Sequence, residues 1–142
     1  MIFITTVLLC SCSKPSSVAG NVVSWATQVS FASNVETIVN DINGIEKQYA
    51  SKDIGSLPTL CTVLGQDAQN FYTNALPSPS TQINQVLSKG LEMTYKGSFA
   101  CYKDGVNKKI SDLSKDVLLL KNSLKYFSTA QELVASYQAK LG

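Results

Sequence analysis

The chain has 142 residues, enough for one domain with a buried core, and 44% of them are hydrophobic. It contains no histidine and no arginine, so its 12 basic residues are all lysines, and its net charge is +2. This composition excludes histidine-dependent acid–base catalysis and histidine metal sites, and so small a charge argues against nucleic-acid binding.

The chain begins with an uncharged apolar run, "IFITTVLL", at residues 2–9. The run is too short to span a bilayer as a helix, but it has the length of the apolar region of a secretory signal peptide. The stretch "LCSC" that ends it resembles the lipobox of bacterial lipoproteins, in which a leucine and two small residues precede a lipidated cysteine. The resemblance implies a signal peptide over residues 1–12 and a lipid on Cys12. Cys10 fits the motif less well because the bulky Leu9 directly precedes it.

The next stretch, "SKPSSVAG" at residues 13–20, is small and polar and predicts a flexible tether. Two alternatives to a leader remain for the residues before it. Residues 2–9 could belong to the folded core, or Cys10 and Cys12 could form a metal site with the other two cysteines. The metal site is disfavoured because structural zinc sites usually pair cysteines two to four residues apart, twice over. We therefore expect a lipid-anchored protein on the extracytoplasmic face of the cell membrane or, failing that, a secreted one.

The segment from residue 20 to residue 51 carries two apolar stripes at helical spacing. The upstream stripe includes Val22 and Trp25, and the downstream stripe includes Val35, Ile38 and Ile42. The sequence "SNVE" at residues 33–36 matches a capping box, so the helix is expected to restart there if it is interrupted.

Two further helices are predicted over residues 57–76 and 81–103, separated by the helix-breaking loop "PSPS". Folding this hairpin at its loop brings Cys61 and Cys101 to the same end, with an axial mismatch of about 7 Å. An even pair of cysteines in an exported chain predicts a disulfide, which would stabilise the fold by about 4 kcal/mol. Small residues on the cysteine-bearing face of the second helix predict a close approach to a neighbour: Gly90, Thr94 and Gly97.

The most regular apolar pattern runs from Val106 to Leu141, after a turn expected at Asp104-Gly105. Capping-box patterns within residues 128–132 allow a break in this last helix. No sustained alternating pattern calls for a strand. The sequence therefore predicts an all-α domain over residues 21–142, an up-down-up-down four-helix bundle with one interhelical disulfide.

The predicted helices carry no recognisable catalytic constellation, phosphate loop or calcium loop, so we expect a non-enzyme without cofactor or metal. Lys89, Lys96 and Lys103 repeat every seven residues and share one helical face. That basic face would suit an anionic envelope polymer or lipid headgroups, although a solvated helix face explains it without a partner. Aromatic residues in the last two helices are interpreted as core and rim or, alternatively, as the lining of a ligand groove.

The run from Cys61 through "LPSPS" to Cys101 and "KDG" resembles the helical hairpin of small exported proteins and lipoproteins of actinobacteria. Those proteins carry a cysteine on each helix and a Pro-x-Pro turn between them. The resemblance implies export and a disulfide and transfers no activity. The function expected from the sequence is a non-catalytic, lipid-anchored module that binds an envelope protein or polymer. The alternative is an extracytoplasmic carrier or sensor for a small apolar ligand bound between the helices.

Overall fold

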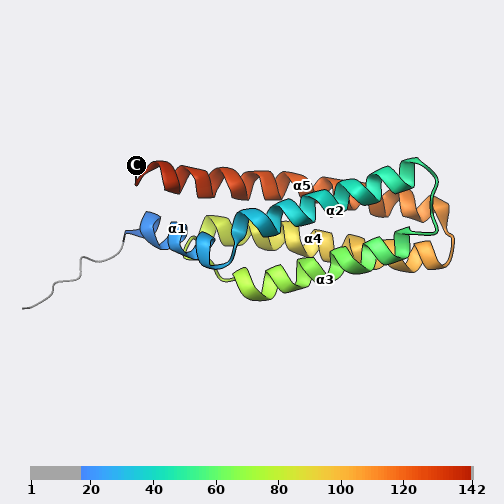
Figure 1. Cartoon of the computed structure of the whole chain (residues 1–142), viewed down its shortest axis with the longest axis horizontal. Helices are drawn as coiled ribbons and strands as arrows, with labels where there is room; N and C mark the ends of the chain where they lie inside the picture. Colours follow the sequence, from blue (N-terminus) through green and yellow to red (C-terminus); the bar gives the residue numbers. More distant parts are fainter. Residues whose placement is uncertain (1–16, 142) are drawn as a thin grey trace, which may run out of the picture.

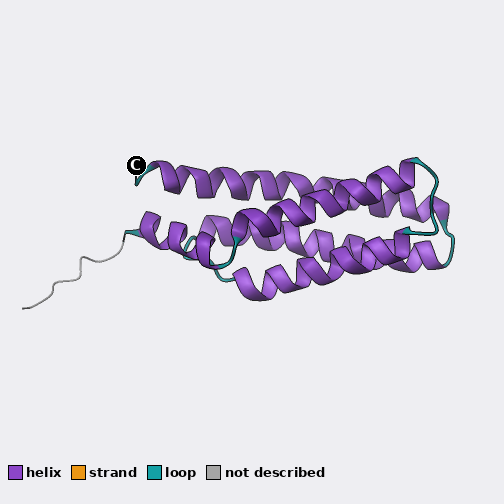
Figure 2. Cartoon of the chain, viewed as in Figure 1, coloured by secondary structure: helices purple, strands orange, loops and turns teal. Residues whose placement is uncertain are grey.

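The computed structural model describes residues 17–141, and the regular structure in that part of the chain is entirely helical (Figure 2). No strand occurs among these residues, which confirms the all-α prediction. Residues 17–141 form five helices: α1 (Val18–Gln28), α2 (Phe31–Ala50), α3 (Leu57–Ala75), α4 (Thr81–Val106) and α5 (Ile110–Ala139).

The four long helices, α2 to α5, lie side by side, and each reverses the direction of the one before it (Figure 1). α2 and α4 each contact both α3 and α5, so the four helices enclose one core. α1 packs against α5 and α2 at one end, where the start of α1 and the end of α5 lie near each other (Figure 1). α1 begins at Val18, with Ser17 as its N-cap, so the predicted tether over residues 13–20 ends in the first turn of this helix.

The predicted number of helices was wrong, because the first segment forms two helices instead of one. The chain bends at Val29 and Ser30, three residues before the predicted capping box, and Ser30 adopts the left-handed conformation at φ 49°. Trp25 and Phe31 are six residues apart, so a continuous helix would point them about 120° away from each other. The bend lets both aromatic side chains enter the core, where their ring centroids are 5.5 Å apart.

Trp25 also ties α1 to the far end of α3. Its indole nitrogen Nε1 donates a 2.8 Å hydrogen bond to the backbone oxygen of Ala75, the last residue of α3. The last carbonyls of a helix have no partner within the helix, so this bond satisfies two buried polar groups at once. Phe31 continues the contact, with its ring centroid 6.1 Å from that of Phe71 on α3.

The α3–α4 hairpin follows the prediction at its loop and departs from it at its far end. α3 begins after Ser56 with Pro58 in its first turn, and the loop over residues 77–80 separates the two helices. The turn expected at Asp104-Gly105 was wrong, because α4 continues to Val106. A Cβ atom at Gly105 would lie 3.1 Å from Pro58 Cγ, so the missing side chain there allows the end of α4 to pack on the start of α3.

α4 and α5 approach each other closely along the small residues predicted to do so. A Cβ atom at Gly97 would lie 2.7 Å from Leu120 Cδ2, and one at Gly90 would lie 3.0 Å from Tyr126 Cβ. Between these two points, the buried hydroxyl of Thr94 donates to Ser123 Oγ at 3.0 Å. The close approach is therefore confirmed, with α5 as the partner.

α5 is the longest helix and has no break at residues 128–132. Ser128 Oγ donates to Glu132 Oε1 at 3.3 Å within the continuous helix instead of capping a new one. The predicted apolar stripe is buried only in its middle part, because the residues at its two ends, Val106, Ile110 and Leu141, are more than half exposed.

Candidate functional site

An open groove with a volume of about 700 Å³ lies on the surface between α3 and α4. We call it the aromatic groove, and its walls come from the two helices that the sequence predicted to be joined by a disulfide. The lining residues are Cys61, Thr62, Gly65, Gln66, Gln69 and Asn70 on α3, and Tyr95, Ser98, Phe99 and Tyr102 on α4. A smaller hollow of about 140 Å³ shares Gln69 and Tyr95 with the groove and extends it toward Tyr72 and Glu92.

The α4 wall of the groove is a row of exposed aromatic side chains. Tyr95, Phe99 and Tyr102 are 48%, 64% and 45% exposed, respectively. Steps of four and three residues place them on one side of the helix, over about 10 Å of its length. α4 therefore has two distinct faces, one buried in the core and composed largely of small residues, and one with large aromatic side chains that lines the groove. Tyrosine side chains of this kind are enriched at interaction surfaces, because the ring packs while the hydroxyl stays hydrated.

The α3 wall is polar and uncharged. Thr62 Oγ1 donates to the backbone oxygen of Pro58 at 2.9 Å, and Gln69 Nε2 donates to Thr73 Oγ1 at 3.5 Å. The exposed amides of Gln66 and Asn70 make no side-chain hydrogen bond within residues 17–141. The hydroxyls of Tyr95 and Tyr102 on the opposite wall make none in that part of the chain either. The groove thus presents hydrogen-bonding groups that the fold does not use.

The floor of the groove is formed where the two helices touch. A Cβ atom at Gly65 would lie 2.8 Å from Ser98 Oγ, so a larger residue there would have to displace the serine. Ser98 Oγ donates to the backbone oxygen of Tyr95 at 2.8 Å, and the Cα atoms of Cys61 and Cys101 are 6.0 Å apart. Because small side chains fill the contact line, the larger ones on either side stand above it and form the walls.

The predicted disulfide between Cys61 and Cys101 is present, so this prediction is confirmed. Cys61 lines the groove directly. Cys10 and Cys12, on which the leader and anchor predictions depend, lie outside the described residues, and the lipidation of Cys12 stays a prediction.

The three lysines of the predicted basic face, Lys89, Lys96 and Lys103, are all exposed on α4. Lys96 lies three residues before Phe99 and Lys103 four residues after it, so both are next to Phe99 on the helix surface, beside the α4 wall of the groove. None of the three forms an ion pair with another residue of the described part of the chain, where the ion pairs are Lys115–Asp112 and Lys121–Glu46. The lining of the groove itself carries no charged side chain, and at its edges lie Lys96, Lys103 and, in the adjoining hollow, Glu92.

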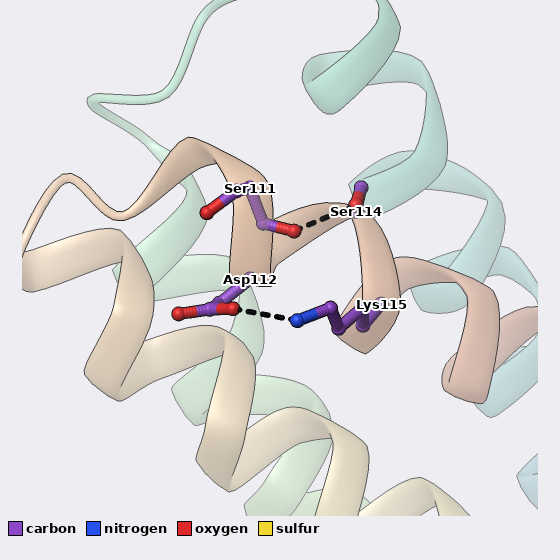
Figure 3. Close-up of polar contacts among 4 residues, drawn as sticks. All are labelled: Ser111, Asp112, Ser114 and Lys115. Atoms are coloured by element: carbon purple, nitrogen blue, oxygen red, sulfur yellow. Dashed lines mark hydrogen bonds and ion pairs between the residues drawn. The ribbon is translucent and has the colours of Figure 1, made fainter.

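A second unusual feature lies between α4 and α5. Asp116 is only 9% exposed, and its Oδ2 has no hydrogen-bond partner within the described residues. Burial, together with the neighbouring carboxylate of Asp104, raises the pKa of Asp116 from 3.8 to about 6. One turn earlier, Lys115 Nζ lies 2.9 Å from Asp112 Oδ1, which lowers the pKa of Asp112 (Figure 3). Two carboxylates of the same helix therefore have opposite pKa shifts.

A second pair of neighbouring carboxylates, Asp41 on α2 and Asp67 on α3, lies between those two helices. Asp41 has a buried Oδ2 without a hydrogen-bond partner in the described residues, and burial and the nearby Asp67 raise its pKa. Asp67 itself is only partly buried, which matches a position at the edge of the apolar stripe. Within residues 17–141, no three side chains of the metal-binding types converge as a metal site. None of the helices in that part of the chain combines the length and apolarity needed to cross a membrane.

Sequence reasoning gave a ligand groove only as the alternative interpretation of the aromatic residues, and it missed the burial of Asp116. The aromatic residues of α4 were interpreted mainly as core and rim. Their spacing of four and three residues, on a different face of the helix from Cys101, was a signal that could have favoured the groove. Asp116 gave no signal in the sequence, although it is nearly buried in the structure. No protein-family model matches the chain, and no curated protein or solved structure is significantly similar to it.

Proposed function

We propose that this chain is a non-catalytic binding module displayed on the extracytoplasmic face of the cell membrane, anchored by a lipid on Cys12, and that it takes up its ligand in the aromatic groove. The exposed row of Tyr95, Phe99 and Tyr102 is the observation that carries the proposal. The opposite wall carries the amides of Gln66 and Asn70, which make no side-chain hydrogen bond in the described fold. Aromatic side chains with a polar handle are enriched at interaction surfaces because one part packs while the other stays hydrated.

The lining supports binding over catalysis because it offers little acid–base chemistry. It holds no carboxylate and no amine, and its one cysteine is bonded to Cys101. The alternative, a carrier that encloses a small apolar ligand, has less support, since the groove is open to solvent along its length. Close contacts such as Gly97 against Leu120 also argue for an interior filled by side chains.

We further propose that α2 to α5 correspond to the four-helix bundle expected from the sequence, with α1 as an addition at one end. The support is that each long helix returns along the previous one and that the last contacts the first. In this arrangement the aromatic groove lies on the outside of one pair of neighbouring helices.

The anchor is tested by mass spectrometry of the protein isolated from the membrane fraction. A mature N-terminus at a lipidated Cys12 is expected. A chain that retains Met1 without modification would overturn the anchor and the signal peptide together. A processed chain without lipid, recovered from the medium, would replace anchoring by secretion.

The role of the groove is tested by co-sedimentation with purified bacterial cell envelopes. The full chain carrying Cys12→Ser removes the lipid contribution, and the double variant Tyr95→Ala/Phe99→Ala removes two rings of the groove. We expect the double variant to lose most of the envelope binding. Leu118→Ala is the matched control, because Leu118 is 56% exposed on α5, away from the groove. Equal binding by the parent and the double variant would overturn the proposed function.

A further inference from the structure

We propose that the occupant of the aromatic groove is a carboxylated polysaccharide, a chain of pyranose rings that carry uronic acid groups. This inference rests on the proposed function, since it names the ligand class for the same groove. Three properties of the site support it: the aromatic row, the unpartnered amides and hydroxyls, and the lysines along one edge.

The aromatic row suits sugar rings. One face of a pyranose ring consists of C–H groups, which pack on the face of an aromatic ring while the hydroxyl groups point outward. Tyr95, Phe99 and Tyr102 offer three such surfaces over about 10 Å, a length that several consecutive rings of a polymer would follow. A flexible polyphosphate or poly(glycerol phosphate) has no rings to place there.

The opposite wall suits hydroxyl groups. The side-chain amides of Gln66 and Asn70 can each donate and accept hydrogen bonds, as sugar hydroxyls do. A packed protein helix would cover these amides with apolar side chains and leave them unsatisfied, which costs about 1–3 kcal/mol for each buried group. The polar wall therefore disfavours an amphipathic helix as the occupant.

The lysines beside the groove favour an acidic polymer as the ligand. Lys96 and Lys103 stand beside the aromatic row without an ion-pair partner in residues 17–141, and α3 contributes no charge to the lining. Glu92 borders the adjoining hollow, so the two lysines outnumber the acid at this edge. A second copy of the chain would bring two such lysine rows together, which is unfavourable. Carboxylates spaced along a sugar chain would instead meet the lysines while the rings lie on Tyr95, Phe99 and Tyr102. The groove is open to solvent, which suits a polymer that continues past it, whereas a small ligand is normally buried on most sides.

The test is a set of calorimetric titrations of the full chain carrying Cys12→Ser. The probes are an oligogalacturonate, its methyl ester, poly-glutamate and a proline-rich peptide. The ester keeps the rings without the charge, and poly-glutamate keeps the charge without the rings. We expect the oligogalacturonate to bind, the ester to bind about tenfold more weakly, and poly-glutamate and the peptide to show no saturable binding.

Two sets of variants test the aromatic row and the lysines separately. Tyr95→Ala/Phe99→Ala should weaken oligogalacturonate binding more than tenfold. Lys96→Gln/Lys103→Gln should make the acid and its ester bind equally. The control Lys47→Gln/Lys52→Gln removes the same charge from the end of α2 and the turn after it, and should keep the preference for the acid.

Absence of oligogalacturonate binding, equal binding of poly-glutamate, or preferred binding of the proline-rich peptide would each overturn the inference. These outcomes are distinct from failure of the proposed function. If the double aromatic variant loses envelope binding but the parent does not bind oligogalacturonate, the groove is a binding site with another occupant. If the aromatic variant binds envelopes as the parent does, both proposals fail.

Discussion

Replacement of Asp116 by asparagine tests whether a buried acid weakens this fold at neutral pH. Burial, together with the neighbouring carboxylate of Asp104, raises the pKa of Asp116 to about 6. Relative to the ordinary value of 3.8, this shift corresponds to about 3 kcal/mol against the ionised form in the folded chain. The pKa of Asp116 is higher in the folded than in the unfolded state, so its protonated side chain contributes its full stabilisation of the fold below about pH 4. This stabilisation is lost as the pH rises through about 6.

Asparagine keeps the shape of the side chain, carries no charge, and has an amide that can donate to Asp104. We therefore expect Asp116→Asn to raise the free energy of unfolding at pH 7 by up to about 3 kcal/mol, and the melting temperature by about 10 °C. The gain should disappear near pH 3.5, where aspartate at this position is already protonated. Urea unfolding followed by circular dichroism at a series of pH values measures both quantities.

The control for this variant is Asp112→Asn, one turn away on the same helix. Asp112 pairs with Lys115 and its pKa is lowered, so its removal should not stabilise the protein at pH 7 (Figure 3). A stability gain of Asp116→Asn that is equal at pH 3.5 and pH 7 would show that charge is not its cause. A loss of stability at pH 7 would show that the ionised carboxylate is needed, and would refute the reasoning.

Four other changes follow from the packing and from the disulfide. Gly97→Ala places a Cβ atom 2.7 Å from a buried leucine of α5 and should lower the free energy of unfolding by about 1–3 kcal/mol. Gly44→Ala, with no atom within 4 Å of the new Cβ, should raise the free energy of unfolding by about 1 kcal/mol. Urea unfolding of the two glycine variants checks that one is destabilised and the other stabilised. Trp25→Phe removes the hydrogen bond from α1 to the end of α3 and should cost about 1–2 kcal/mol, with faster amide exchange in α1; unchanged exchange would contradict this role. Reduction of the Cys61–Cys101 disulfide should cost about 4 kcal/mol, and identical melting temperatures with and without reductant would contradict it.

The helices were predictable because the apolar periodicity that defines them is local. The disulfide was predictable for a related reason: a short loop between two helices fixes which residues face each other across the hairpin. The bend at Ser30 was not predictable, because its cause is not local. Phe31 enters the core beside Trp25 only when α3 supplies Phe71 as a further contact. The capping-box pattern at residues 33–36 does not mark the start of α2, because the contact of Phe31 with Trp25 and Phe71 determines where the helix restarts.

The groove was harder to predict because α4 has two distinct faces. Both faces show helical spacing, and a single sequence does not tell which of them a neighbouring helix covers. The core face was assigned correctly through Cys101 and the small residues beside it. Tyr95, Phe99 and Tyr102 were assigned mainly to core and rim, because aromatic residues usually lie there. Their exposure follows from the positions of α3 and α5 around α4, which leave that side uncovered.

The disulfide connects the stability of this protein to its proposed binding site. Cys61 lies in the groove and joins α3 to the helix that carries the aromatic row, so the bond fixes the distance between the two walls. A site whose walls are held in place loses less conformational freedom on binding than one whose walls move. We therefore expect Cys61→Ser/Cys101→Ser to weaken envelope binding even at temperatures where circular dichroism shows intact helices. Gly97→Ala is the control, since it destabilises the α4–α5 contact without touching the groove. If both variants bind equally well, the disulfide acts on stability alone.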